Sequence, residues 1–346
     1  MDFRSDNTAG VLPQIMAALH AANHATQPSY GADAISARLE RRLSDQFERK
    51  VAVFPVPTGS AANALALSAL TPPWGAIYCH RLAHIEVDET NGPEFYTGGA
   101  KLRLLDGENA RFSADTLDAA LRLAPGGGVH NPQPAVVSIT QITELGAAYR
   151  PADIGAIAEV AQRRKLRVHM DGARFANALG FLGCAPADIS WKVGVDVLSL
   201  GATKGGAMGA EAVVAFDQGL AEELAFRRKR AGLLFSKMRF VAAQLEAFVA
   251  DGLWIETARR ANTLAADLGR GLAQVPGIAL VAPVEGNMVF AKLPRAVTEG
   301  LQADGFNFYD GEGGAKDAAR FVCSFATTTE EVEALIAAAR RHADRS

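Results

Sequence analysis

Short apolar runs alternate with amphipathic stretches along most of the chain. The runs with the length and residue types of buried strands are 50–55, 135–140, 166–170, 195–200 and 211–216. The stretches with apolar residues at helical spacing are 34–47, 64–71 and 151–165. Because near-continuous apolar strands separated by helices are typical of a sheet covered on both faces, the pattern predicts an α/β fold with a mostly parallel sheet.

The pattern changes after about residue 250. Two helices are expected there, at 256–275 and 329–343. The short strands expected between them are 278–283, 288–293 and 320–325. Strands mixed with helices in one region predict a smaller α+β domain. We therefore expect a large domain over 1–250 and a small domain over 251–346.

Composition and charge restrict the partners. The chain has 346 residues, of which 49% are hydrophobic and 21% are charged, as in ordinary globular proteins. Its formal net charge of −3 argues against nucleic acid or an anionic membrane as the main partner. Cys79, Cys184 and Cys323 form no CxxC pair, which favours a reducing compartment. Without a signal-peptide pattern or a membrane-spanning apolar run, a cytoplasmic protein is expected.

The segment "PTGSAANALAL" places Thr58, Gly59 and Ser60 between a strand signal and a helix. Free N–H groups at the start of a helix bind anions, and the Ser60 hydroxyl would add a donor. Ser and Thr also cap helices that bind no ligand, so the segment alone indicates either a phosphate site or a plain cap. It lacks the glycine spacing of the dinucleotide fingerprint and of the P-loop.

The segment "LRVHMDGARFANA" places Asp171 where a predicted strand ends, with Gly172 and Arg174 directly after it. Ligands of open α/β sheets bind at the carboxyl ends of the strands. An aspartate held there can keep a pyridine nitrogen protonated. The alternative is that Asp171 caps the following helix and that Arg174 is solvated.

The segment "SLGATKGGAMG" surrounds Lys204 with glycines, which are expected to leave room beside the lysine amine. A buried lysine can have a lowered pKa and form a Schiff base with an aldehyde, although most lysines in glycine turns are surface residues. Together, the three segments offer partners for a phosphate, a ring nitrogen and an aldehyde. Pyridoxal 5'-phosphate carries all three groups, so it is the predicted cofactor.

The segment "CHRLAHIEVDE" carries His80, His84 and Asp88 at intervals of four residues. On a helix these side chains would share a face and could bind a metal. No other convincing ligands accompany them, so no metal is predicted. Stacking of one histidine ring on the cofactor is the favoured interpretation.

These motifs, taken together, resemble the threonine aldolases of the fold-type I pyridoxal-phosphate enzymes. The strings that carry the resemblance are "FRSDN", "PTGSAAN", "AHIEVDETNGPEF", "HMDGARF", "GATKGG", "RKRAGLLFSKMRF" and "ARFVCSF", which extend over nearly the whole chain. The chain is most similar to the bacterial low-specificity L-threonine aldolases, which also act on phenylserine.

The resemblance implies roles for particular residues. Lys204 would form the Schiff base with the cofactor, Asp171 would pair with the pyridine nitrogen, and His84 would stack on the ring. Gly59 and Ser60 would bind the phosphate.

The resemblance also implies substrate contacts and an assembly. Ser5, Arg174 and Arg320 would bind the amino acid carboxylate, which brings the N-terminal segment into the site and places Arg174 beside the cofactor. Lys229 or Lys237 would reach the phosphate of a neighbouring subunit, although "RRKR" is equally interpretable as a solvated helix face. A homo-oligomer, either a dimer or a tetramer, with sites at the subunit interface is therefore expected.

The segment "TQITELG" departs from the family pattern. Other branches carry a histidine near the substrate hydroxyl, in a segment close to "ENTHNG", whereas Glu144 falls at or beside that place here. The base for the hydroxyl proton is therefore left open between His84, Glu144 and a held water.

The resemblance implies cleavage of L-threonine or L-allo-threonine to glycine and acetaldehyde. The substrate amine would displace Lys204 to form an external aldimine, and retro-aldol cleavage of the Cα–Cβ bond would follow. The alternatives are another pyridoxal-phosphate reaction, such as β-elimination or transamination, and, more distantly, a non-catalytic protein that binds a nucleotide or a metal.

Overall fold

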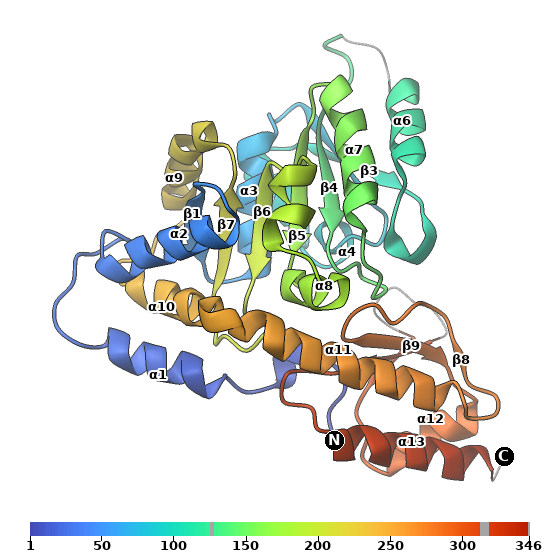
Figure 1. Cartoon of the computed structure of the whole chain (residues 1–346). Coiled ribbons are helices and arrows are strands. Elements are labelled where there is room, and N and C mark those ends of the chain that lie inside the picture. Colours follow the sequence, from blue (N-terminus) through green and yellow to red (C-terminus); the bar gives the residue numbers. More distant parts are fainter. Residues whose placement is uncertain (125–127, 312–317, 345–346) are drawn as a thin grey trace.

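Seven strands form the larger of two sheets, in the order β1-β7-β6-β5-β4-β2-β3 (Figure 1). The computed structural model describes residues 1–124, 128–311 and 318–344. The strands are β1 Ala52–Val56, β2 Gly75–His80, β3 Lys101–Leu105, β4 Gln133–Thr140, β5 Arg167–Gly172, β6 Val197–Gly201 and β7 Glu211–Ala215. β2 pairs in parallel with β3 and β4, and β5 pairs in parallel with β4 and β6. Only β7 runs antiparallel to its neighbours β1 and β6, which confirms the mostly parallel sheet.

Two hydrophobic cores cover the two faces of this sheet. Successive residues of β7 alternate between them, because neighbouring side chains in a strand point to opposite faces. Ala212 and Val214 belong to one core, and Val213 and Ala215 to the other. The helices that surround the sheet are α1 Pro13–Ala22, α2 Ala34–Gln46, α3 Gly59–Leu70, α4 His84–Val87, α5 Gly92–Thr97, α6 Ala114–Leu123, α7 Pro151–Arg163, α8 Phe175–Leu182, α9 Ala221–Arg230 and α10 Arg239–Phe248.

The long helix α11 (Leu253–Leu272) runs below the large sheet and leads to the second sheet (Figure 1). That sheet is antiparallel throughout, in the order β10-β11-β9-β8. Its elements are β8 Ala279–Leu280, β9 Met288–Lys292, β10 Tyr309–Asp310, β11 Ala319–Val322, α12 Arg295–Ala303 and α13 Thr329–Ala343. A third core, separate from the other two, joins these strands to α11, α12 and α13. The prediction of a smaller α+β region is thereby confirmed.

The N-terminal segment lies along the small sheet. The Phe3 N–H donates to Asn307 O and the Val322 N–H donates to Phe3 O, both at 2.8 Å. Phe3 is fully buried in the small core. The next residues form a 3₁₀ turn, η1 (Asp6–Thr8), whose first residue is buried. Contacts of this kind join the first residues of the chain to its last strands.

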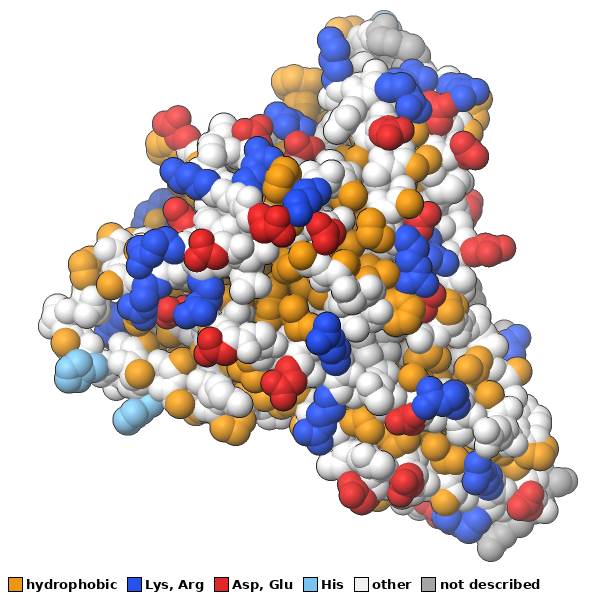
Figure 2. Space-filling model, in the orientation of Figure 1, with side chains coloured by type: hydrophobic (Ala, Val, Ile, Leu, Met, Phe, Trp, Pro, Cys, Tyr) orange, Lys and Arg blue, Asp and Glu red, His pale blue; other side chains and the backbone are white. Residues whose placement is uncertain are grey.

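The surface carries charges of both signs. On the face shown in Figure 2, basic and acidic side chains are interspersed over the large sheet and over the small region. No helix in the described part of the chain combines the length and the apolar character needed to cross a membrane.

Candidate active site

A cavity of about 300 Å³ lies at the carboxyl edge of the parallel strands. Its walls come from the carboxyl ends of β4 and β5, from the loops that follow β1, β4, β5 and β6, from α3 and α4, and from η1. β7 contributes its first residue, Glu211, because an antiparallel strand begins at the edge where its neighbours end. The cavity brings together Gly59, Ser60, His84, Glu144, Asp171, Arg174 and Lys204.

The start of α3 forms one end of the cavity. Thr58 caps the helix, since its side chain accepts from the Ala61 N–H at 3.1 Å. This cap starts the helix at Gly59, five residues before the predicted stretch. The N–H groups of Gly59 and Ser60 form no hydrogen bond within the described residues, and both residues line the cavity. Two free donors at a helix start can bind an anion.

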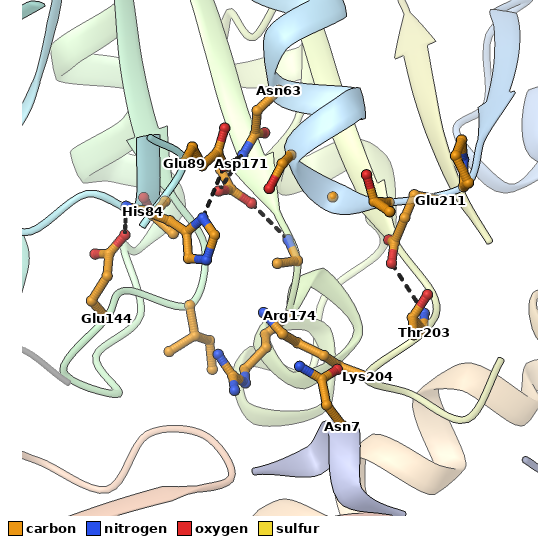
Figure 3. Close-up of a pocket in the computed structure, with 17 residues that line it drawn as sticks. Asn7, Asn63, His84, Glu89, Glu144, Asp171, Arg174, Thr203, Lys204 and Glu211 are labelled. Atoms are coloured by element: carbon orange, nitrogen blue, oxygen red, sulfur yellow. Dashed lines mark hydrogen bonds and ion pairs between the residues drawn. The ribbon is translucent and has the colours of Figure 1, made fainter. Parts of the chain in front are cut away.

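Asp171 is buried near the end of β5. Its Oδ1 accepts from the Ala173 N–H at 3.0 Å, and its Oδ2 accepts from Asn63 Nδ2 at 2.8 Å. The alternative interpretation of Asp171 as a helix cap is wrong, because Arg174 occupies the cap position of α8. Held at both oxygens, the carboxylate faces the cavity without freedom to turn (Figure 3).

Lys204 follows β6 and also lines the cavity (Figure 3). Burial lowers its pKa, and the positive charge of Arg174 lowers it further. Lys204 has open space beside it, since it lines the cavity, but two of the neighbouring glycines serve close packing. A Cβ on Gly201 would lie 2.6 Å from Ala173 O, and one on Gly205 would lie 2.5 Å from the Phe248 ring, so these glycines allow close packing behind the lysine.

Arg174 is bound by a partner that the sequence did not indicate. Its Nε and Nη2 donate to the two oxygens of Asp6 at 2.8 and 2.9 Å, a bidentate pair. Asn287 Nδ2 donates to the same carboxylate at 3.0 Å. Burial opposes the ionisation of Asp6, but the charges of Arg174 and Lys204 outweigh it and lower the pKa of Asp6. The alternative of a solvated Arg174 is therefore wrong.

Arg320 and Ser5 lie next to this pair but do not line the cavity itself. Arg320 packs its guanidinium over the Tyr309 ring and donates to Arg4 O at 3.1 Å. Its Nε is buried and has no hydrogen-bond partner among the described residues. Burial, and then the charge of Arg174, lower the pKa of Arg320. The Ser5 hydroxyl accepts from the backbone N–H of Asn7 at 3.2 Å, in the cap of η1.

His84 begins the short helix α4 and is partly exposed to the cavity (Figure 3). Its Nδ1 lies 2.8 Å from Oε1 of Glu89, and this hydrogen bond raises the pKa of the imidazole. The interval of four residues from His80 has no helical meaning, because His80 is the last residue of β2. His80 instead contacts Gly107 O and accepts from the Leu82 N–H.

Two further acids line the cavity. Glu144 Oε1 accepts from the backbone N–H of His84 at 3.0 Å, while its buried Oε2 has no hydrogen-bond partner in the described chain. Burial raises the pKa of Glu144 to about 7. Glu211 was not predicted; it accepts from the N–H groups of Ala202 and Thr203 at 3.0 and 3.4 Å, and burial raises its pKa to about 7.

The two predicted partner lysines do not line the cavity of their own chain. Lys229 lies in α9 with its ammonium 4.8 Å from the centroid of the Tyr30 ring, and Lys237 is exposed in the loop before α10. Arg228, beside Lys229, packs over Phe54 and has a buried Nε without a hydrogen-bond partner in the described residues. Burial lowers its pKa to about 10.

The groups present fit pyridoxal 5'-phosphate. Free donors at Gly59 and Ser60 match a phosphate, a fixed carboxylate at Asp171 matches a pyridine N–H, and the lowered pKa of Lys204 suits an amine that bonds to an aldehyde. The fold and this set of groups define an enzyme of the fold-type I pyridoxal-phosphate class.

Comparisons with known proteins agree with this assignment to the pyridoxal-phosphate enzymes. Residues 2–295 match the beta-eliminating lyase family. The low-specificity L-threonine aldolase of Pseudomonas aeruginosa is 43% identical over 96% of this chain and 95% of its own length, and that of a further Pseudomonas strain is 41% identical over 97% and 96%. The solved structure of Leishmania major threonine aldolase superposes with a TM-score of 0.92 at 26% identity, over 99% of both chains. The chain belongs to the threonine aldolases of the beta-eliminating lyase family and is a lyase that uses pyridoxal 5'-phosphate.

Proposed function

We propose that the enzyme cleaves L-threonine and L-allo-threonine to glycine and acetaldehyde, and cleaves other L-β-hydroxy-α-amino acids, such as phenylserine, to glycine and the matching aldehyde. The observation that carries the proposal is the cavity itself. It offers the arginine that binds Asp6, and it also offers an imidazole and an acid with a pKa of about 7. A β-hydroxy-α-amino acid needs a cation for its carboxylate and a base for its hydroxyl proton.

The bound cofactor supplies an electron sink for cleavage of the Cα–Cβ bond. Gly59 and Ser60 hold its phosphate, and Asp171 keeps a proton on its ring nitrogen. Lys204 can lose its proton near neutral pH more readily than an exposed lysine, which prepares its Nζ for bonding to the aldehyde carbon.

Arg174 and Arg320 bind the substrate carboxylate in this proposal. The guanidinium of Arg174 keeps donors that Asp6 does not use, since Asp6 occupies only its Nε and one Nη2 hydrogen. Arg320 offers a buried Nε that lacks a partner in the described chain. Ser5 adds a hydroxyl beside them.

His84 and Glu144 are the residues proposed to take the proton of the β-hydroxyl. The Glu144 carboxylate is half deprotonated near pH 7, which suits a general base at neutral pH. His84 presents a ring nitrogen to the same space and stacks beside the cofactor ring.

The products test the proposal. The purified holoenzyme is incubated with L-threonine, L-allo-threonine, L-phenylserine and L-serine, and glycine, aldehyde, keto acid and ammonia are quantified. Equal amounts of glycine and aldehyde are expected. The family description makes β-elimination the rival, and keto acid with ammonia in place of glycine would establish that reaction instead.

The proposal includes a homo-oligomer with shared sites in the cytoplasm, where the three free cysteines would stay reduced. Lys229 or Lys237 would then reach a neighbour's phosphate, which backbone donors and one hydroxyl leave under-neutralised. Mixing Lys204→Ala with Lys229→Ala or Lys237→Ala subunits should restore part of the activity, because a hybrid contains one site free of both changes. An active monomer, or inactive hybrids, would contradict shared sites.

A further inference from the structure

A chain of hydrogen bonds joins the two residues that flank the cofactor ring site. Oε1 of Glu89 lies 2.8 Å from Nδ1 of His84 and 2.9 Å from Nδ2 of Asn63. The same Nδ2 lies 2.8 Å from Oδ2 of Asp171. Figure 3 shows the four side chains converging from α3, α4, the turn after α4, and β5. Glu89 and Asn63 have no role in the function proposed above.

Glu89 is held in an unusual position for an acid. Its side chain is 1% exposed, and Oε2 is buried with no hydrogen-bond partner in the part of the chain that the structure describes. The next two residues, Thr90 and Asn91, have φ values of 47° and 59°, in the left-handed region that non-glycine residues rarely adopt. This conformation accompanies a turn that buries a carboxylate next to the cavity.

Asn63 separates the two buried carboxylates. An amide NH₂ has two hydrogens, and these two contacts direct one toward Glu89 and one toward Asp171. Asn63 lies four residues after Gly59, one turn further along α3. The helix whose first N–H groups face the phosphate site therefore also fixes both acids.

We propose that Glu89 is a positioning residue that accepts the Nδ1 proton of His84, so that Nε2 is the nitrogen left to exchange a proton with the reactants. Nε2 forms no hydrogen bond with the described residues, and Figure 3 places it on the cavity side of the ring. A neutral imidazole carries one proton, so an acceptor at Nδ1 leaves a lone pair at Nε2. The catalytic consequence rests on the proposed function, in which His84 faces the substrate.

The charges around His84 determine how its titration midpoint changes when one of them is removed. Glu89 follows it in the next turn, Asp171 faces it from β5, Lys204 from the loop after β6, and Glu144 accepts from its backbone N–H. The hydrogen bond to Glu89 is the largest cause of the raised pKa, with Asp171 adding to it and burial and Lys204 opposing it. Loss of the Glu89 charge should lower the midpoint of the His84 titration by about 1 pH unit.

The direct test is the tautomer of His84 in the holoenzyme. Imidazole ¹⁵N shifts are recorded by NMR on histidine-labelled protein, and the His84 signals are assigned by their loss in His84→Asn. Above the titration midpoint, the proton is expected on Nδ1. A neutral ring with its proton on Nε2 would overturn the proposal, and this measurement needs no change at Glu89.

Two substitutions separate charge from hydrogen bonding. Glu89→Gln keeps an acceptor and should lower the midpoint by about 1 pH unit, whereas Glu89→Met removes the acceptor and should move the neutral proton to Nε2. Both should lower kcat about 10- to 100-fold with a smaller effect on KM. The control is Glu86→Gln, an exposed acid of α4, which should change neither signal nor rate.

The outcomes distinguish this inference from the proposed function. An unchanged midpoint in Glu89→Gln together with an unchanged tautomer in Glu89→Met would refute the role of Glu89. An Nδ1 proton in an enzyme that forms no glycine and aldehyde would support the positioning by Glu89 and refute the aldol cleavage.

Discussion

The two ends of the cavity are built in different ways. At the cofactor end, Gly59, Asp171 and Lys204 lie at or shortly after the ends of three strands of the large sheet. At the carboxylate end, Asp6 comes from the N-terminal turn and Asn287 from the loop before β9. The hydrogen bonds of Asp6 to Arg174 and to Asn287 join residues 168 and 281 positions apart.

The first end is built from short sequence segments, whereas the second end is built from contacts between residues far apart in the sequence. The cofactor end depends on where each strand stops, a feature that short sequence patterns reveal. The carboxylate end depends on the N-terminal segment docking on the small sheet, which no local pattern reveals. Changes at the first end should therefore alter the bound cofactor, whereas changes at the second should alter substrate affinity and leave the cofactor spectrum intact.

The largest expected effect is at Lys204, at the cofactor end of the cavity. Lys204→Ala should abolish the absorbance of the lysine-bound cofactor and lower turnover by more than about 10³-fold, because the amine is the proposed covalent attachment. Absorbance spectra before and after borohydride measure the first effect. The control is Lys192→Ala, an exposed lysine paired with Glu48 and Asp188. An unchanged spectrum in Lys204→Ala would place the covalent bond on another lysine.

Much of the fold was predictable because buried strands carry apolar runs. The predicted stretch at 135–140 lies in β4, the stretch at 211–216 covers β7 and one further residue, and the closing helix at 329–343 matches α13. β2 was not among the predicted strands; its sequence "GAIYCH" ends in the first residues of the histidine segment, which was considered for its chemistry and not as a strand. The stretch 278–283 forms only the two-residue strand β8, which pairs with β9 alone at the edge of its sheet.

The site residues that could be predicted are those whose positions depend on the local sequence. Asp171 and Lys204 were identified from their positions after strands. Asp6 and Glu89 were not identified, because an acid in a turn gives no sequence signal for the cation or imidazole that it meets in space. Asn63 stood inside the quoted segment "PTGSAAN", and its position one turn after Gly59 was a signal that could have been used.

Glu144 provides the next test; it lines the cavity and accepts from the backbone N–H of His84. The kcat/KM of the wild-type enzyme should rise with pH through about 7, because burial raises the pKa of Glu144 to about 7 and a base must be deprotonated to act. Glu144→Gln should remove that rise and lower kcat/KM about 10²-fold, with the cofactor spectrum unchanged. If the rise persists in Glu144→Gln and disappears in His84→Asn, the imidazole is the base.

Arg320 tests the carboxylate end directly. Arg320→Ala should weaken the binding of glycine and L-threonine by roughly 30- to 1,000-fold, because a charged contact to the carboxylate is lost. Spectral titration with glycine measures this affinity, and a parallel titration of the apoenzyme measures cofactor affinity, which should change little. Normal glycine affinity in this variant would show that the substrate carboxylate binds elsewhere.

The smallest expected effect, and the sharpest test of the comparison, is at Asp6. Asp6→Asn removes the charge and one of the two acceptors that hold Arg174, so the guanidinium should turn more freely. The KM for L-threonine should rise about 10-fold, with kcat and the cofactor spectrum nearly unchanged. Asp2→Asn is the control, since Asp2 pairs with Arg4 at the surface of the same segment.

Because a buried pair is broken in Asp6→Asn, the free energy of unfolding should also fall by about 3 kcal/mol. A loss of stability without a rise in KM would mean that Asp6 anchors the N-terminal segment but does not orient Arg174. The long-range contacts of Asp6 would then stabilise the fold without affecting substrate binding.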